Sequence, residues 1–382
     1  MIVIVYPEFY GVAGIARYLD SFLANLPERA PQVVLITGEA LRDPPEYRGV
    51  EIIHLALGRT RLGLLIWSWR ARRLLRELHR LRPVTAVSLQ IPPLIPGLFV
   101  GREFPVVLTA HTTYEGMSGR FEGNRNFSSP WNPLALWIKT RMEQRLIDRA
   151  DRIITLTEQG RQELALYGRH DRIDVIPNGV DCAQFDEIEG VERDIDVLFA
   201  GRIEKRKGSR PLAEVCRRLI EREPRIRIAI VGYGDDEAHV RAALQPWPDN
   251  VLFTGRVPFD AMAALYHRSK LYASTSYYEG LPGTCLEAMA AGLPAVVWDL
   301  LFYRGLVQDG VTGLLALPND HDGLADGILR LMGDPSLTRR MGARARSLVR
   351  ERYDWRRLAG HVIASHAPAR QPADTAARQV AA

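Results

Sequence analysis

Short apolar runs, rich in valine and isoleucine, alternate along the chain with segments of helical periodicity. Continuous apolar strands separated by helices are typical of parallel sheets that are covered on both faces. The first half of the chain is therefore predicted to be doubly wound α/β. Its first helix is predicted over Gly14–Leu26, and its strands over Ile2–Tyr6, Val33–Thr37, Val50–Leu55, Val84–Leu89, Val106–Ala110, Arg152–Leu156 and Arg172–Ile176.

A second series of the same kind follows a polar link, Asp181–Asp194, which has few apolar residues. We place the domain boundary in this link, which gives domains of residues 1–180 and 181–351. A helix at about 352–366 is expected to pack back on the first domain, and residues 367–382 are expected to be disordered. The predicted strands of the second domain are Val197–Ala200, Arg227–Val231, Val251–Thr254, Leu271–Ala273, Pro294–Val297 and Gly313–Ala316.

Composition agrees with two globular domains, because 382 residues that are 47% hydrophobic and 25% charged can bury two cores. A net charge of +5 permits an anionic ligand or a membrane surface but does not favour nucleic acid. The three cysteines, Cys182, Cys216 and Cys285, form neither a disulfide framework nor a metal knuckle, so a cytoplasmic protein is expected. The N-terminal run MIVIVY is expected to be a strand rather than a leader, and no run of about 18 apolar residues predicts a membrane span.

Two polar stretches stand at the carboxyl ends of predicted strands, where open α/β sheets bind ligands. The first, GRIEKRKG at Gly201–Gly208, precedes a helix predicted from about Ser209. Arg202 and Lys207 offer cations to a phosphate group, and the helix start favours anions. The alternative is a solvated basic turn.

The second polar stretch, Ser274–Val297, carries Glu279 and Glu287 around a glycine-rich turn. Thr284 followed three residues later by Glu287 is a capping-box pattern, so a helix is expected from about Cys285 to Gly292, with Glu287 bonded to its own backbone. The two carboxylates are also suited to sugar and ribose hydroxyls. A third interpretation is the acid and base pair of a glycoside hydrolase.

These stretches, together with VIPNGVD at Val175–Asp181, AGRI at Ala200–Ile203 and VGYG at Val231–Gly234, resemble retaining GT-B glycosyltransferases of family 4. The resemblance extends from Ile2 to about Trp355. It implies two facing Rossmann-like domains with a cleft between them, and a nucleotide-sugar donor bound to the second domain.

The resemblance also implies roles for individual residues. Arg202 and Lys207 would hold the distal phosphate of the donor, Glu279 would contact the donor sugar, and Glu287 the ribose. The nucleotide base of the donor would lie near Gly255–Val257. The predicted catalytic residues are then Arg202, Lys207, His111 and Glu279, and the predicted donor-binding residues are Gly14, Gly201, Arg256, Val257, Gly280, Leu281, Pro282, Gly283, Thr284 and Glu287.

In the first half, the family uses a glycine-rich turn after the first strand, which is YGVAG here, at Tyr10–Gly14. The usual pair of adjacent glycines is missing, so Gly14 is kept as a phosphate contact and Gly11 is not. His111 follows the strand VVLTA and matches a histidine that lies beside the donor sugar. From its position alone, a lone histidine after a strand is more often structural, and the resemblance favours a site role.

No metal or cofactor is expected. Asp194 and Asp196 introduce a strand, His170 beside Asp171 is predicted to lie in a loop, and Cys285 is a packing residue. The donor is expected to be a UDP- or GDP-sugar. Since no carboxylate can be assigned as a nucleophile, retention is expected to proceed by same-face attack, with the donor phosphate as the base.

The segment Arg59–Arg82 is basic and amphipathic and contains Trp67 and Trp69. It is suited to an anionic membrane surface, or alternatively packs on the sheet with tryptophan inward and arginine outward. The polar loop Thr112–Pro130 is expected to line the acceptor pocket.

The sequence therefore predicts a hexosyltransferase with a glycan or lipid-linked acceptor, in polysaccharide or cell-envelope synthesis, in the cytoplasm or at the inner face of the membrane. Two alternatives are a nucleotide-sugar epimerase of the same fold and a non-catalytic nucleotide-sugar-binding protein. Nucleic acid is not an expected partner.

Overall fold

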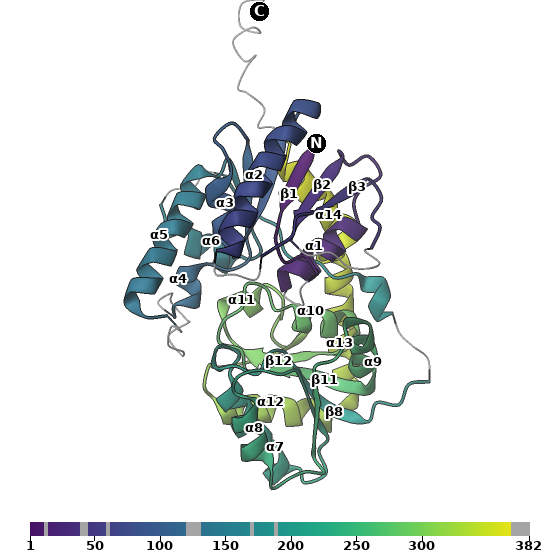
Figure 1. Cartoon of the computed structure of the whole chain (residues 1–382). Helices are drawn as coiled ribbons and strands as arrows, with labels where there is room; N and C mark the ends of the chain where they lie inside the picture. Colours follow the sequence, from purple (N-terminus) through teal and green to yellow (C-terminus); the bar gives the residue numbers. More distant parts are fainter. Residues whose placement is uncertain are drawn as a thin grey trace, which may run out of the picture.

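The computed structural model describes residues 1–10, 14–38, 45–58, 62–119, 131–168, 172–186 and 190–367. Two parallel sheets, each covered by helices, form the two halves of the molecule (Figure 1). The predicted loop residues 120–130, the pair His170 and Asp171, and the tail from residue 368 onward lie outside the described residues.

The N-terminal sheet has seven parallel strands in the order β3-β2-β1-β4-β5-β6-β7. In the register, Ile2 pairs with Val33 on one side and with Ala86 on the other. The strands are β1 (Ile2–Val5), β2 (Val33–Thr37), β3 (Val50–His54), β4 (Ala86–Ile91), β5 (Val106–Ala110), β6 (Arg152–Thr155) and β7 (Ile173–Val175). The helices are α1 (Gly14–Ala24), α2 (Gly63–Leu81), α3 (Ile95–Phe99), α4 (Tyr114–Met117), α5 (Pro133–Arg149) and α6 (Glu158–Ala165).

The C-terminal sheet has six parallel strands in the order β10-β9-β8-β11-β12-β13, so its first strand also lies in the middle. The strands are β8 (Ile195–Ala200), β9 (Ile228–Val231), β10 (Val251–Gly255), β11 (Ser269–Ser274), β12 (Ala295–Trp298) and β13 (Gly313–Ala316). The helices are α7 (Ser209–Arg222), α8 (Glu237–Leu244), α9 (Phe259–Arg268), α10 (Gly283–Ala290), α11 (Leu301–Arg304), α12 (His321–Gly333) and α13 (Pro335–Arg352).

Successive side chains along a strand point to opposite faces of the sheet, so the N-terminal sheet has one apolar core on each face. On β1, Val3 and Val5 belong to one cluster of buried side chains, while Ile4 belongs to another. The predicted doubly wound architecture is thus confirmed, and every predicted strand is present. The largest displacement is at β4, which was expected at Val84–Leu89.

The last helix, α14 (Trp355–Ser365), returns to the N-terminal sheet. The ring of Trp355 lies 5.0 Å from that of Tyr18 on α1, and Ser365 donates a hydrogen bond to Asp174 at 2.7 Å. Val180 and Asp354 form a bridge where the chain passes between the two halves. The two halves are therefore joined by two neighbouring chain segments.

Candidate active site

The basic loop after β8 is held against the end of β11. Its last residue, Gly208, has φ +71°, and a Cβ there would lie 1.9 Å from the carbonyl oxygen of Thr275. Only glycine permits this approach without moving the backbone. The loop includes a short 3₁₀ turn, Lys205–Lys207, and α7 begins directly after it at Ser209, as predicted.

Lys207 forms an ion pair with Glu279, which joins the two polar stretches of the sequence. Their side chains are only 20% and 11% exposed. Burial lowers the pKa of Lys207, and the neighbouring Glu279 opposes this shift. The pair is therefore a largely desolvated cation and anion.

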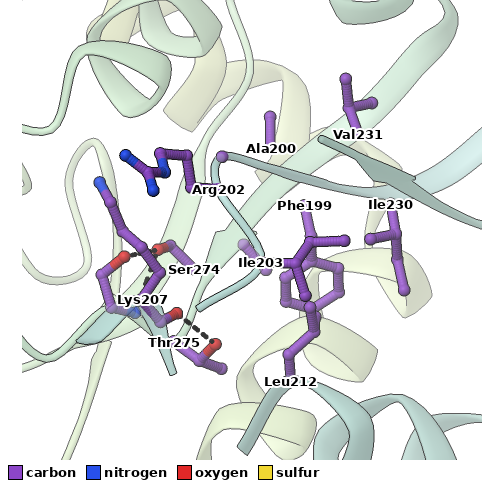
Figure 2. Close-up of a pocket in the computed structure, with 13 residues that line it drawn as sticks. Phe199, Ala200, Arg202, Ile203, Lys207, Leu212, Ile230, Val231, Ser274 and Thr275 are labelled. Atoms are coloured by element: carbon purple, nitrogen blue, oxygen red, sulfur yellow. Dashed lines mark hydrogen bonds between the residues drawn. The ribbon is translucent and has the colours of Figure 1, made fainter. Parts of the chain in front are cut away.

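Arg202 lies beside this pair and is 63% exposed, with Glu204 at 3.2 Å. Figure 2 shows Arg202 and Lys207 extending to the same side of the loop. The cavity behind them, which Gly201 and Ser274 also line, encloses only about 30 Å³. That volume suits a water molecule rather than a nucleotide.

The second polar stretch corrects the capping-box prediction. Helix α10 starts at Gly283, two residues before the expected start, and no side chain caps it. The Thr284 hydroxyl bonds instead to the Ala200 carbonyl oxygen and the Tyr272 hydroxyl, both at 3.0 Å. Thr284 thereby ties the start of α10 to the end of β8.

The Glu287 side chain does not cap the start of its own helix. It forms an ion pair with Arg17, on α1 of the other half. Its second oxygen accepts a hydrogen bond from the Tyr266 hydroxyl at 2.8 Å. Burial raises the pKa of Glu287, against the opposing influence of Arg17. Glu287 therefore has polar partners from both halves of the molecule.

His111 is buried at the end of β5, where its Nε2 lies 2.8 Å from Gln90 Oε1. Because a carbonyl oxygen only accepts, Nε2 carries the proton and Nδ1 is an acceptor. Burial lowers the pKa of His111 to about 3, so the ring is neutral at physiological pH. Tyr18 contacts this ring edge-on, with centroids 4.7 Å apart.

The predicted residues of the two halves meet at Gly280. A Cβ at Gly280 would lie 1.9 Å from the His111 carbonyl oxygen. His111, Glu279 and Gly280 also line one small cavity at the junction. Leu281 packs against apolar clusters of both halves. The structure thus brings His111 and the Lys207 and Glu279 pair to the same place.

The helix starts at Gly14 and Gly283 are open, since nothing lies within 4 Å of a Cβ built at either glycine. Helices α1 and α10 are neighbours at the junction (Figure 1). Pro282 precedes the first turn of α10. Residues 11–13, which belong to the predicted glycine-rich turn, lie outside the described residues.

Arg256 and Val257, the predicted base contacts, follow β10. Val257 is partly buried against the C-terminal core, and the Arg256 guanidinium lies 6.0 Å from the Tyr233 ring. Tyr233 follows β9 in the VGYG stretch and is 46% exposed. An aromatic ring and a guanidinium here form a surface on which a planar base can stack.

Asp194 and Asp196 form ion pairs with Arg268 at 2.6 Å and with Lys270 at 2.7 Å. Within the described ranges, no three His, Cys, Asp or Glu side chains are grouped as a metal site requires. Cys285 is buried and free. The interpretation of the two aspartates as a strand entry agrees with these contacts.

Several polar partners in the site were missed by the sequence reasoning. Arg17 lies one turn into the predicted first helix, so the sequence placed it near Gly14. Its ion pair with Glu287 of the other half could not be predicted from the sequence. Arg206 donates to the Tyr278 carbonyl oxygen at 3.2 Å. Gln90, which sets the His111 tautomer, is with Ser88 one of two buried polar residues in strand β4, and that signal was overlooked.

Comparison with known families agrees with this geometry. The sequence model described as "Glycosyl transferases group 1" matches residues 183–348, and the one described as "Glycosyltransferase Family 4" matches residues 12–184. The chain belongs to this glycosyltransferase family. The predicted family membership is confirmed, and the two doubly wound halves have the predicted GT-B fold.

Among curated relatives, D-inositol 3-phosphate glycosyltransferase of Nocardia farcinica is 32% identical over 53% of this chain and 49% of its own length. Phosphatidyl-myo-inositol mannosyltransferase of Mycolicibacterium smegmatis is 33% identical over 49% of this chain and 50% of its own length. The chain thus spans about half the length of the curated relatives that it matches. Neither name is that of an epimerase or of a non-catalytic protein.

Among solved structures, HepE of Anabaena in complex with UDP-glucose superposes with a TM-score of 0.74. The match covers 95% of this chain and 98% of HepE, at 17% identity. This likeness concerns the fold of both halves together. No helix in the described part of the chain is long and apolar enough to cross a bilayer.

Proposed function

We propose that the protein transfers a hexose-type sugar from a nucleoside-diphosphate sugar to a glycan or lipid-linked glycan, with retention of configuration. The observation that carries the proposal is the buried Lys207 and Glu279 pair, flanked by Arg202 on one side and by His111 on the other. Cations and a sugar-binding carboxylate meet there, at the carboxyl ends of β8 and β11.

In this proposal, Arg202 and Lys207 hold the distal phosphate of the donor. Negative charge grows on that phosphate as the glycosidic bond breaks, and a fixed cation stabilises it with little reorganisation. Lys207 is already fixed by Glu279. The same cations make a metal ion unnecessary for the leaving group, and we propose a metal-independent reaction.

Glu279 is held by Lys207 and is therefore poorly placed to serve as a covalent nucleophile. Same-face attack fits this arrangement: the acceptor hydroxyl forms the new bond while the phosphate departs, and a phosphate oxygen takes the hydroxyl proton. Neutral His111 accepts a hydrogen bond from the sugar through Nδ1 rather than acting as a base, since its pKa is about 3.

The rest of the donor lies along the C-terminal half. Glu287 binds the ribose, and the backbone from Gly280 to Thr284 lies along the sugar and phosphate. The base stacks near Arg256 and Val257. The complex of HepE with UDP-glucose favours a UDP-sugar, with a GDP-sugar as the other candidate.

Exposed apolar side chains on two helices support an acceptor held at an anionic membrane. On α2, Ile66 is 54% and Trp69 is 56% exposed, whereas Trp67 is buried, so this helix both packs on the sheet and presents a tryptophan outward. On α5, Leu134 is 67% and Trp137 is 57% exposed. Helix α3 lies between α2 and α5 and contacts both (Figure 1).

Exposed arginines beside this apolar face, among them Arg70 and Arg73, suit the negative surface of anionic lipid. Residues 59–61 of the predicted segment lie outside the described residues. The phosphatidylinositol named for the mycobacterial relative is consistent with a lipid acceptor. The free, buried thiols suit a reducing compartment, so we place the enzyme at the cytoplasmic face.

Membrane contact is tested by sedimentation with vesicles of phosphatidylcholine and phosphatidylglycerol. Trp69→Ser and Trp137→Ser should each reduce the bound fraction. Leu317→Ser, which removes a 67% exposed apolar residue of the C-terminal half, is the matched control. Equal binding by all three variants and the wild type would exclude this face as the contact.

The donor is tested by a thermal-shift screen against UDP, GDP, ADP and their sugars, followed by nucleotide release with a crude acceptor extract. We expect stabilisation by one nucleotide class and release that depends on the acceptor. Stabilisation by none of them would contradict the proposal.

A further inference from the structure

A tyrosine of the C-terminal half is inserted into the N-terminal half next to the proposed reaction centre. Tyr278 is 1% exposed, and its hydroxyl donates a hydrogen bond to Glu163 Oε2 on α6 at 2.9 Å. The same hydroxyl accepts from the backbone amide of Thr113 at 3.4 Å. One phenol therefore bonds to two different segments of the opposite half.

Glu163 is the centre of this arrangement and is itself 1% exposed. Its Oε2 accepts from the Thr113 hydroxyl at 2.6 Å as well as from Tyr278, and its Oε1 accepts from Gln159 at 2.8 Å. Burial raises the pKa of Glu163, while these three hydrogen bonds lower it. Three donors that converge on one buried carboxylate fix its position strongly.

The bonded residues flank the site on both sides. Thr113 lies two residues after His111, and Tyr278 lies immediately before Glu279. Glu163 and Tyr278 also line the small cavity that His111, Glu279 and Gly280 share. One carboxylate is thus connected, within two residues, to the proposed sugar contacts of both halves.

The backbone of two glycines approaches this cavity closely. A Cβ at Gly116 would lie 2.3 Å from Glu163 Oε2 and 2.4 Å from the Tyr278 hydroxyl. On the other side of the cavity, Gly280 lies directly against the His111 carbonyl oxygen. The hydrogen bonds and the close approach at the two glycines thus join the halves at this point.

We infer that Glu163 and Tyr278 are a positioning pair, which fixes Glu279 and Gly280 against His111 and so determines the geometry of the reacting sugar. The inference rests on the proposed transfer reaction. Neither residue needs to touch the donor, because displacing reacting groups by about 1 Å is enough to cost on the order of 100-fold in rate. Glu287, the proposed ribose contact, has separate partners in Arg17 and Tyr266 and does not depend on this pair.

A purely structural role for Glu163 makes a different prediction. Its bonds to Thr113 and Gln159 lie within the N-terminal half and persist when only the Tyr278 hydroxyl is removed. Tyr278→Phe therefore removes the hydrogen bonds of this hydroxyl to Glu163 and Thr113 and leaves the remainder of the Glu163 network in place. Tyr277→Phe is the matched control, because that hydroxyl bonds to Asn319 of its own half at 2.5 Å.

The experiment compares kcat, donor KM and UDP affinity in the full-length variants. We expect Tyr278→Phe to lower kcat by about 10-fold or more with UDP affinity within about twofold, and Tyr277→Phe to leave all three unchanged. Glu163→Gln should lower kcat similarly, and the double variant should be no slower than the slower single one. Unchanged kcat in Tyr278→Phe, or an equal loss in Tyr277→Phe, would overturn the inference.

A second readout does not need turnover. Hydrogen exchange at the amides of Thr113–Met117 and Glu279–Gly283 should be faster in Tyr278→Phe than in the wild type, and unchanged in Tyr277→Phe. Equal exchange in all three proteins would refute the pair. If the wild type shows no transfer, the proposed function fails, while the exchange result still decides whether the pair joins the halves.

Discussion

Replacing Lys207 by methionine should cause two losses that can be measured separately. The change removes the ammonium but keeps an apolar side chain of similar length. Since Lys207 and Glu279 are 20% and 11% exposed, the carboxylate is left in a largely dry site without its cation. Breaking a buried pair in this way typically costs about 3–5 kcal/mol, and we expect about 3 kcal/mol because neither side chain is fully buried.

The second loss is in catalysis. If Lys207 stabilises the departing phosphate, Lys207→Met should lower turnover at saturating donor by about 100 to 1,000-fold. Adding Glu279→Gln removes the orphaned charge, so the double variant should regain stability to within about 1 kcal/mol of the wild type while turnover stays low. If the double variant regains stability but not turnover, the role of Lys207 at the phosphate is separate from its role in stabilising the fold.

The assays are urea unfolding for stability and nucleotide release for turnover. Lys270→Met is the matched control, because Lys270 pairs with Asp196 at 2.7 Å at the opposite end of the same sheet and is 47% exposed. It should cost at most about 1 kcal/mol and leave turnover unchanged. Turnover of Lys207→Met within tenfold of the wild type, or full recovery of turnover in the double variant, would refute the reasoning.

Three further predictions concern ligand affinity, pH and metal. Glu287→Gln should weaken UDP binding in calorimetry by about 10-fold, because a ribose hydroxyl loses a charged acceptor, whereas Tyr266→Phe should change it less; unaltered affinity would contradict the ribose role. Burial raises the pKa of Glu143 to about 7, from 4.5 in the unfolded chain. Between these values the folded state binds more protons, so the free energy of unfolding should fall by up to about 3 kcal/mol as the pH rises from about 5 to about 8. Glu143→Gln should remove that dependence, and an equal fall in the variant would assign it to other groups. A chelator should leave turnover intact, and metal-dependent turnover would contradict the proposed mechanism.

The fold was predictable because parallel strands are covered on both faces and read as continuous apolar runs. The bounds of β2, β5 and β13 agree residue for residue with the sequence pattern. Where an element's bounds differ from the prediction, tertiary contacts are the cause. Helix α10 was misplaced by two residues because Thr284 and Glu287 bond to distant groups instead of completing a local capping box. The domain boundary near Asp181 stays a prediction.

The site was predictable only one half at a time. The motif residues could be named, but a sequence does not show that Arg17 meets Glu287 across 270 positions, or that Tyr278 meets Glu163 across 115. Helix periodicity also left the two tryptophans of α2 unresolved. Residues two positions apart point in different directions, and so Trp67 is buried while Trp69 is exposed.

Retaining sugar transfer is tested most directly by the anomeric proton of the product. The purified protein is incubated with UDP-glucose or GDP-mannose and a crude lipid and glycan extract, and the transferred sugar is followed by NMR. We predict a product with the anomeric configuration of the donor, formed only when acceptor is present and lost in Lys207→Met. An inverted product, or conversion of the donor to its epimer without acceptor, would contradict the account.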